Sequence, residues 1–258
     1  MPPDPVRIAM WSGPRNISTA MMRSFGARLD TAVVDEPFYA AYLAGSGSLH
    51  PMRAEVLASQ PQDWREVVAA LLGPVPGGRP IYYQKLMTHH MLESFGRDWL
   101  GSVRNAFLIR DPQAVLNSYV RIRERGNPTL ADLGFVQQQE LFERVADRLG
   151  AAPPVVEGAD ILADPPRMLA RLCAALEIPY AEAMLSWPSG RRDTDGVWAP
   201  AWYASVERST GFAPPPPPAA APAPQSAATL PAPLLRIAEQ ARPHYEVLAV
   251  HRLRQGKV

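Results

Sequence analysis

The sequence predicts an α/β fold of three layers, in which a mostly parallel central sheet lies between helices. Short apolar runs alternate with segments of helical periodicity along the chain. A strong helix-start signal, Asp111-Pro112, directly follows one of these runs. The chain has 258 residues, of which 47% are hydrophobic and 20% charged, so it can bury one large core.

Five short segments are expected to form strands. The first, 6–11, is an apolar run that ends at a turn signal, Ser12-Gly13-Pro14. The others are 31–35, 80–84, 105–109 and 154–157. Ligands of such folds bind beyond the carboxyl ends of the strands. The segments that follow the first four strands are therefore the places to search for a site.

Helices are expected at 18–29, 64–72, 112 to about 125, and 165–176. Asp111 is a good N-cap and Pro112 suits the first helical position, so the start of the third helix is well marked. A terminal helix is indicated by apolar residues at four-three spacing, Leu234, Ala238, Ala241, Tyr245 and Leu248. Pro243 is expected to kink or split this helix.

Proline distribution divides the chain into three parts. Residues 1–212 are expected to form the α/β domain, and 234–258 a helical extension that packs on it. Of the 29 prolines, nine fall between Pro214 and Pro233. Segment 213–233 is therefore interpreted as a linker or surface loop. Docking of the run 214–218 on an aromatic groove of a partner is the alternative.

Composition excludes several classes of protein. Lys and Arg number 26 against 25 Asp and Glu, so the net charge of +1 gives no general attraction to nucleic acid or to an anionic membrane. The single cysteine, Cys173, permits neither an internal disulfide nor a cysteine-rich zinc site. No signal peptide and no membrane helix are expected. These observations favour a cytoplasmic protein without metal, nucleic-acid or membrane partners.

The segment Ser12-Gly13-Pro14-Arg15-Asn16-Ile17-Ser18-Thr19 joins the first strand to the first helix. A loop in this place can direct backbone N–H groups and the positive end of a helix at a phosphate. Arg15 adds a bidentate donor, and Ser18 and Thr19 add hydroxyls. The lysine of the NTPase P-loop is absent, so a nucleotide site here is expected to work without metal. A polar turn with a helix cap is the alternative.

A second candidate for phosphate binding is Arg110 with Ser118, eight positions later. Arg110 leaves the carboxyl end of a predicted strand, and Ser118 lies almost two turns into the next helix. Both side chains can converge on one phosphate, the guanidinium by charge and the hydroxyl by hydrogen bonding. In isolation, a surface arginine and an ordinary helical serine would be the simpler interpretation.

Together these residues resemble the sulfotransferases that use 3′-phosphoadenosine 5′-phosphosulfate (PAPS). Segment 14–19 is similar to the family's 5′-phosphosulfate loop, and Arg110 with Ser118 to its 3′-phosphate site. Two later segments, 155–165 and Gly196-Val197-Trp198, are also similar, so the resemblance spans about 6–212. The chain departs from the pattern at Ile17, where glycine is common, and at Arg15, where lysine is commoner.

The resemblance implies a P-loop-like sulfotransferase fold and PAPS as co-substrate. It assigns cofactor binding to Gly13, Pro14, Arg15, Asn16, Ile17, Ser18, Thr19, Arg110, Ser118 and Trp198. Trp198 would stack on adenine, although an anchor for a hydrophobic lid is the alternative. The apolar region 38–49 would shape the pocket for a small-molecule acceptor.

Catalytic roles implied by the resemblance fall on two segments. Glu36 follows the second strand and would remove the proton of the acceptor, while Asp35 would fix the turn. After the third strand, Lys85 would steady charge on the leaving oxygen, and His89 or His90 is the other candidate for the base. The sequence does not choose between Glu36 and a histidine.

The function predicted from the sequence is in-line transfer of a sulfuryl group to a hydroxyl or amine of a small molecule. The alternative is a catalytically silent sulfotransferase-like protein that binds a nucleotide or a partner. An NTP-dependent kinase is a third hypothesis, which the absence of the Gly-Lys pair of the P-loop disfavours.

Overall fold

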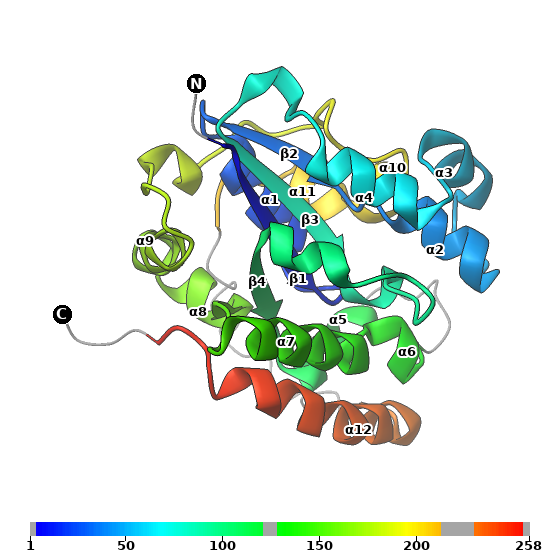
Figure 1. Cartoon of the computed structure of the whole chain (residues 1–258). Coiled ribbons are helices and arrows are strands. Elements are labelled where there is room, and N and C mark those ends of the chain that lie inside the picture. Colours follow the sequence, from blue (N-terminus) through cyan, green and yellow to red (C-terminus); the bar gives the residue numbers. More distant parts are fainter. Residues whose placement is uncertain (1–3, 121–127, 213–229, 255–258) are drawn as a thin grey trace.

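The computed structural model describes residues 4–120, 128–212 and 230–254. Its strands are β1 (Val6–Ser12), β2 (Thr31–Asp35), β3 (Ile81–Met87), β4 (Arg104–Ile109) and β5 (Val155–Glu157). They form one sheet in the order β2-β3-β1-β4-β5, and every neighbouring pair is parallel (Figure 1). The predicted α/β class is therefore confirmed, with a sheet that is parallel throughout. β3 continues to Met87, beyond the predicted 80–84, which places Lys85 inside the strand.

Helices cover both faces of the sheet (Figure 1). On one face α1 (Ser18–Gly26), α8 (Gly158–Ala163) and α9 (Pro165–Ala175) enclose a core that includes Ile8 and Met10 of β1. On the other face α4 (Trp64–Leu72), α7 (Phe135–Leu149) and α12 (Ala232–Ala249) enclose a core that includes Ala9 and Trp11. Successive residues of β1 thus pack on opposite faces, as the period of a strand requires.

The remaining helices are short and lie mainly beyond the carboxyl edge of the sheet. They are α2 (Tyr39–Ser46), α3 (Arg53–Ser59), α5 (Pro112–Val120), α6 (Leu130–Leu133), α10 (Ala199–Trp202) and α11 (Ala204–Glu207). Single 3-10 turns occur at Pro76–Gly78, Thr88–His90, Asp98–Ser102 and Glu182–Leu185. Segment 38–49, expected to be part of a pocket, is thus largely helix α2.

The predicted helix starts are confirmed by their capping bonds. The side chain of Asp111 accepts a hydrogen bond from Ala114 N at 3.0 Å, and that of Asp164 accepts one from Arg167 N at 3.3 Å. α1 ends at Gly26 instead of the predicted 29, because Leu29 is 86% exposed and has no core to pack on. The predicted helix residues beyond Val120, like the prolines of 213–229, lie outside the described residues.

Pro243 was expected to kink or split the terminal helix, and it does not split it. α12 runs unbroken from Ala232 to Ala249. Ala241 is buried against α5 and α6, and Leu248 against α7, so packing on each side of Pro243 holds both halves in one helix. The amphipathic helix α7, which provides much of this surface, was not among the predicted elements.

The carboxyl ends of β1 to β4 meet at one edge of the sheet, where the residues that follow them form a common surface. No helix in the described part of the chain combines the length and apolarity that a membrane span requires.

Candidate functional site

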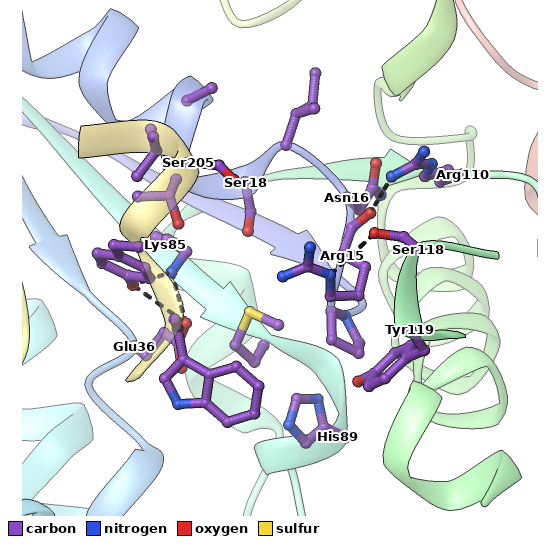
Figure 2. A pocket seen from close by; sticks show the side chains of 18 of the residues that line it. Arg15, Asn16, Ser18, Glu36, Lys85, His89, Arg110, Ser118, Tyr119 and Ser205 are labelled. Atoms are coloured by element: carbon purple, nitrogen blue, oxygen red, sulfur yellow. Dashed lines mark hydrogen bonds and ion pairs between the residues drawn. The ribbon is translucent and has the colours of Figure 1, made fainter. Parts of the chain in front are cut away.

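A cavity of about 810 Å³ lies at this carboxyl edge (Figure 2). Its walls come from the loop after β1, the turn after β2, the end of β3, the start of the segment after β4, and α10 to Phe212. The predicted residues that line it are Pro14, Arg15, Asn16, Ile17, Ser18, Thr19, Glu36, Lys85, His89, His90, Arg110 and Ser118. Gly13 and Trp198 are not among the lining residues.

The loop after β1 is held in an unusual backbone conformation. Arg15 and Ile17 both have positive φ values, 60° and 36°, a region that glycine enters freely and a β-branched residue enters at a cost. Ile17, at the position where the sequence departs from glycine, thus adopts a left-handed conformation that glycine enters without strain. The buried side chain of Asn16 donates from Nδ2 to the Leu108 carbonyl at 2.7 Å and ties the loop to β4.

Gly13 and Gly158 permit the loop to pack closely on its neighbours. A Cβ at Gly13 would lie 2.7 Å from the Leu133 carbonyl oxygen, so this glycine is required for contact with α6. A Cβ at Gly158 would lie 2.8 Å from Asn16 Oδ1. Gly13 therefore allows the loop to pack closely on α6, and the residues that follow Gly13 line the cavity.

α1 begins directly after this loop and no described side chain caps it. Its N-cap is Ile17, which has no side-chain acceptor, so the first N–H groups of the helix have no capping partner. Ser18 and Thr19 lie at the same end and line the cavity. The loop and the helix end together provide backbone donors and a helix dipole, the features that bind anions at helix N-termini in general.

The Arg15 side chain lines the cavity, and its guanidinium has a single described hydrogen-bond partner, Ser118. Its Nε donates to Ser118 Oγ at 3.1 Å, and no carboxylate among the described residues pairs with it. Burial lowers the pKa of Arg15 from its usual value, with a smaller opposite effect of Tyr119. A half-buried cation with no counter-ion of this kind favours the binding of an anion.

Arg110 leaves the end of β4 and approaches the same place. Its Nη1 donates to the backbone carbonyl of Arg15, and Ser118 reaches Arg15 from α5. In the view of Figure 2, Arg110 and Ser118 lie at one side of the cavity and Ser18 at the other, with Arg15 between them. The structure thus brings together the two predicted phosphate-binding segments.

A buried cluster of polar groups lies at the other side of Arg15, around Lys85. Lys85 Nζ donates to Asp35 Oδ1 at 2.8 Å, to Glu36 Oε1 at 2.6 Å and to Tyr203 OH at 2.7 Å. Tyr203 OH donates to Asp35 Oδ2 at 2.7 Å, and Gly196 N donates to the same oxygen at 3.1 Å. Asp35 therefore does more than fix the turn after β2, as it anchors the segment that carries Tyr203.

Burial and neighbouring charges shift the pKa values of Glu36 and Lys85 in opposite directions. Burial raises the pKa of Glu36, and the neighbouring Lys85 ammonium offsets part of that effect. Burial alone would lower the pKa of Lys85, but the carboxylates of Asp35 and Glu36 raise it well above its usual value. Lys85 is therefore a permanent cation at neutral pH, and Glu36 is a stronger base than an exposed glutamate.

The two histidines lie in the turn after β3 among aromatic rings. His90 is 1% exposed and stacks between Tyr39 and Tyr42, with ring centroids 4.6 and 4.9 Å away. His89 meets His90 edge to face at 4.3 Å. Burial lowers the pKa of His89 to about 3 and that of His90 well below its usual value. Both imidazoles are therefore neutral at neutral pH and weaker bases than a free histidine.

Trp198 is a buried anchor and is not among the residues that line the cavity, so its stacking on adenine stays a prediction. Its side chain is 1% exposed, packs edge to face on Tyr39 and donates from Nε1 to Tyr203 OH at 3.2 Å. A Cβ at Gly196 would lie 2.1 Å from the indole, so the ring folds back over that glycine. Trp202, four residues later, lines the cavity instead.

Sequence reasoning missed several lining residues. Three of them follow α10: Tyr203 lies between α10 and α11, Ser205 lies in α11, and Ser209 follows α11. Tyr119, which follows Ser118, is another. Only their place in an aromatic, polar stretch sets them apart in the sequence, and nothing in their spacing marks them. Within the described residues there is no group of three His, Cys, Asp or Glu side chains arranged to hold a metal ion.

A five-stranded parallel sheet, with a loop after its first strand in the position of a P-loop, defines a P-loop-like α/β domain. The chain belongs to the family of sulfotransferase domains, whose family model matches residues 6–238. Its fold is similar to that of the sulfotransferase domain of the Synechococcus PCC 7002 olefin synthase. That comparison has a TM-score of 0.53 and 18% identity and covers 92% of this chain and 94% of that one.

Two curated relatives come from Arabidopsis thaliana. They are branched-chain-amino-acid aminotransferase-like protein 1, 33% identical over 248 residues, and protein 2, 32% identical over 244 residues. These matches cover 96% and 95% of this chain. The chain spans only 42% and 41% of the length of the two relatives, so their names describe much longer proteins.

Proposed function

We propose that this domain transfers a sulfuryl group from PAPS to a hydroxyl or amine of a small-molecule acceptor. Membership of the sulfotransferase family supports the class of reaction. One observation carries the choice of PAPS as the sulfuryl donor. The half-buried Arg15 guanidinium has no described carboxylate partner, and it lies between two sets of hydrogen-bond donors of the kind that bind phosphate. The setting we propose is the cytoplasm, on the sequence argument from its single cysteine.

Each end of the donor nucleotide would meet one of these sets. In this proposal Arg15, Ser18 and Thr19, with the first N–H groups of α1, hold the 5′-phosphosulfate. Arg110 and Ser118 hold the 3′-phosphate. Arg15 also faces the oxygen on which charge grows as the sulfur–oxygen bond breaks, and so stabilises the leaving group.

Glu36 is our choice for the base that accepts the acceptor's proton. It lines the cavity, and burial raises its pKa, whereas burial lowers the pKa of both His89 and His90. A carboxylate with a raised pKa accepts a proton more readily than an imidazole whose pKa is about 3. In this proposal the histidines and Tyr39 form a neutral aromatic wall beside the acceptor.

Calorimetric titration with 3′,5′-adenosine diphosphate tests the nucleotide site. Arg15→Ala and Arg110→Ala should each weaken binding at least about tenfold, because each removes a charged donor from a phosphate. Arg144→Ala is the matched control, since Arg144 is an exposed arginine on α7, far from the cavity walls. Unchanged affinity in both site variants would contradict the proposal.

A second candidate is a domain that binds the nucleotide and has lost catalysis. The left-handed Ile17 favours it, because a β-branched residue in this conformation stores strain in the loop that would hold the reacting group. Thermal stabilisation by 3′,5′-adenosine diphosphate, without transfer of labelled sulfate from PAPS to a broad panel of alcohols, phenols and amines, would support this candidate.

A further inference from the structure

The geometry around Lys85 points to a role that differs from contact with the leaving group. An ammonium group has three N–H donors. Asp35, Glu36 and Tyr203 accept them at 2.8, 2.6 and 2.7 Å, and the Lys85 side chain is 1% exposed. All three donors are therefore used inside the protein, and none is left for an oxygen of a bound nucleotide.

We propose that Lys85, Asp35 and Tyr203 are positioning residues that fix Glu36 as the proton acceptor, and that Arg15 instead of Lys85 meets the charge on the leaving oxygen. This inference rests on the proposed function. It assigns one task to each cation. Arg15, whose guanidinium makes one described hydrogen bond, to Ser118, faces the nucleotide. Lys85, whose three donors are all used inside the protein, faces the base.

Tyr203 joins the cluster from a distant part of the sequence. Its hydroxyl donates to Asp35 and accepts from Lys85 and Trp198, so it uses both its donor and its acceptor sites. Because Asp35 also accepts from Gly196 N, the segment that covers the cavity is bonded to the same carboxylate that orients Lys85. Lys85 thus has one arrangement that satisfies every neighbour.

Glu36 is fixed in its backbone as well as its side chain. Its φ of 41° is left-handed, its N–H donates to the Lys85 carbonyl at 3.0 Å, and its own carbonyl accepts from Gln60 Nε2 at 3.2 Å. Lys85 holds Oε1 at 2.6 Å. No described residue hydrogen-bonds to Oε2, and the Glu36 side chain is 12% exposed at the cavity wall. Oε2 is therefore the oxygen available to an acceptor.

The step that this arrangement serves is balanced within the proposed reaction. The acceptor's O–H or N–H bond breaks and its proton goes to Glu36 Oε2. The electron pair of the acceptor atom forms the new bond to sulfur, and the bond from sulfur to the 5′-phosphate oxygen breaks. That electron pair stays on 3′,5′-adenosine diphosphate, beside Arg15.

Two variants separate the positioning role from a role in phosphate contact. Lys85→Met and Tyr203→Phe are titrated with 3′,5′-adenosine diphosphate beside Arg15→Ala, with Tyr180→Phe as a control away from the site. The proposal expects Lys85→Met and Tyr203→Phe to bind within about twofold of the wild type, and Arg15→Ala to bind at least about tenfold more weakly. A tenfold loss in Lys85→Met would overturn the proposal, because it would place Lys85 on the phosphate.

Carbon-13 NMR of labelled glutamate provides a second readout, with the Glu36 signal assigned through Glu36→Gln. Loss of the Lys85 charge should raise the Glu36 pKa by at least about one pH unit, and Tyr203→Phe should raise it less. An unchanged Glu36 pKa in both variants would contradict the proposal. If Lys85→Met does not fold, the affinity and Glu36 pKa of Tyr203→Phe decide alone. Failure of the wild type to bind the nucleotide would instead overturn the proposed function, whatever the NMR titration shows.

Discussion

Single residues of this site owe their chemistry to burial more than to identity. His89 and His90 are ordinary titrating groups in water, yet among the rings of Tyr39 and Tyr42 the charged form of each is strongly disfavoured. The pKa of Glu36 moves in the opposite direction, upward, because burial disfavours the charged form of a carboxyl group as well. Desolvation thus makes Glu36 a stronger base and His89 and His90 weaker ones. It also makes the free energy of unfolding depend on pH.

Acid should destabilise the protein through His89. An unfolded histidine titrates near 6.5, whereas burial holds the pKa of His89 at about 3 in the folded state. Between these values the unfolded chain binds the extra proton, so the free energy of unfolding falls as the pH is lowered through this window. From pH 7 to pH 5 this residue alone should account for a loss of up to about 2 kcal/mol.

Urea unfolding at pH 7, 6 and 5 measures this loss, with His89→Gln as the comparison. The variant lacks the titrating ring, so its free energy of unfolding should fall less steeply with acid than that of the wild type. His251, an exposed histidine that follows α12, gives the control His251→Gln, which should follow the wild type. Parallel curves for His89→Gln and the wild type would contradict the assignment.

The meeting of Arg15 and Arg110 at one cavity could be predicted from the sequence because each follows the end of a strand. Arg15 follows β1 and Arg110 follows β4, and neighbouring parallel strands bring their carboxyl ends together. The role of Lys85 could not be predicted in this way. Its partners Asp35 and Tyr203 are 50 and 118 positions away in the sequence. Whether any N–H donor of Lys85 remains free for a ligand can therefore be seen only in the folded chain.

At the scale of elements, the periodicity of the sequence predicted the positions of most helices and strands. It did not predict how these elements pack against one another. β2 and α4 have the predicted bounds because their patterns are local. The sheet order β2-β3-β1-β4-β5 has no local signal, and neither does the burial that keeps α12 whole across Pro243. Trp198 illustrates the same limit, since an indole at a predicted cofactor loop turns inward once Gly196 bonds to Asp35.

α12 is joined to the sheet by a polar contact that should contribute measurably to stability. Tyr245 OH donates to Glu157 Oε2 at 2.8 Å, and the Glu157 residue is 7% exposed at the end of β5. Tyr245→Phe leaves this carboxyl without its donor, so the free energy of unfolding should fall by about 1–2 kcal/mol. Chemical denaturation measures the change. Glu239→Gln, on an exposed position of the same helix, should have no effect, and an equal midpoint for all three proteins would refute the prediction.

At the scale of the whole molecule, the segment from Ser186 to Gly211 forms a loop that closes on itself and covers one side of the cavity. Its ends pair through an antiparallel bridge between these two residues, and Trp187 N donates to the Thr210 carbonyl at 3.0 Å. The middle of the loop is attached to the domain by the Asp35 cluster and by a buried ion pair between Arg23 of α1 and Asp195 at 2.7 Å. Trp198 of the loop also packs on Tyr39 of α2 in a buried apolar cluster. Access to the cavity from this side therefore depends on polar contacts as well as on apolar packing.

Asp195→Ala should loosen this loop while the rest of the domain stays folded. The substitution leaves the Arg23 guanidinium, 2% exposed, without its counter-ion, and it also removes the acceptor of the Arg192 N–H. Trypsin should then cleave after Arg191 or Arg192 at least about fivefold faster than in the wild type, because proteolysis reports the population of the open form. The exposed neighbour Asp193 gives the control Asp193→Ala.

Two further measurements distinguish loop opening from general unfolding. If only the loop opens, cleavage after Arg144 and Arg148 on α7 should stay at the wild-type rate, because these sites lie on a packed helix outside the loop. Addition of 3′,5′-adenosine diphosphate should slow cleavage of the loop, since a ligand that contacts the covering segment favours the closed form. Equal cleavage rates after Arg192 in the variant and the wild type would show that the ion pair between Arg23 and Asp195 does not hold the loop in place.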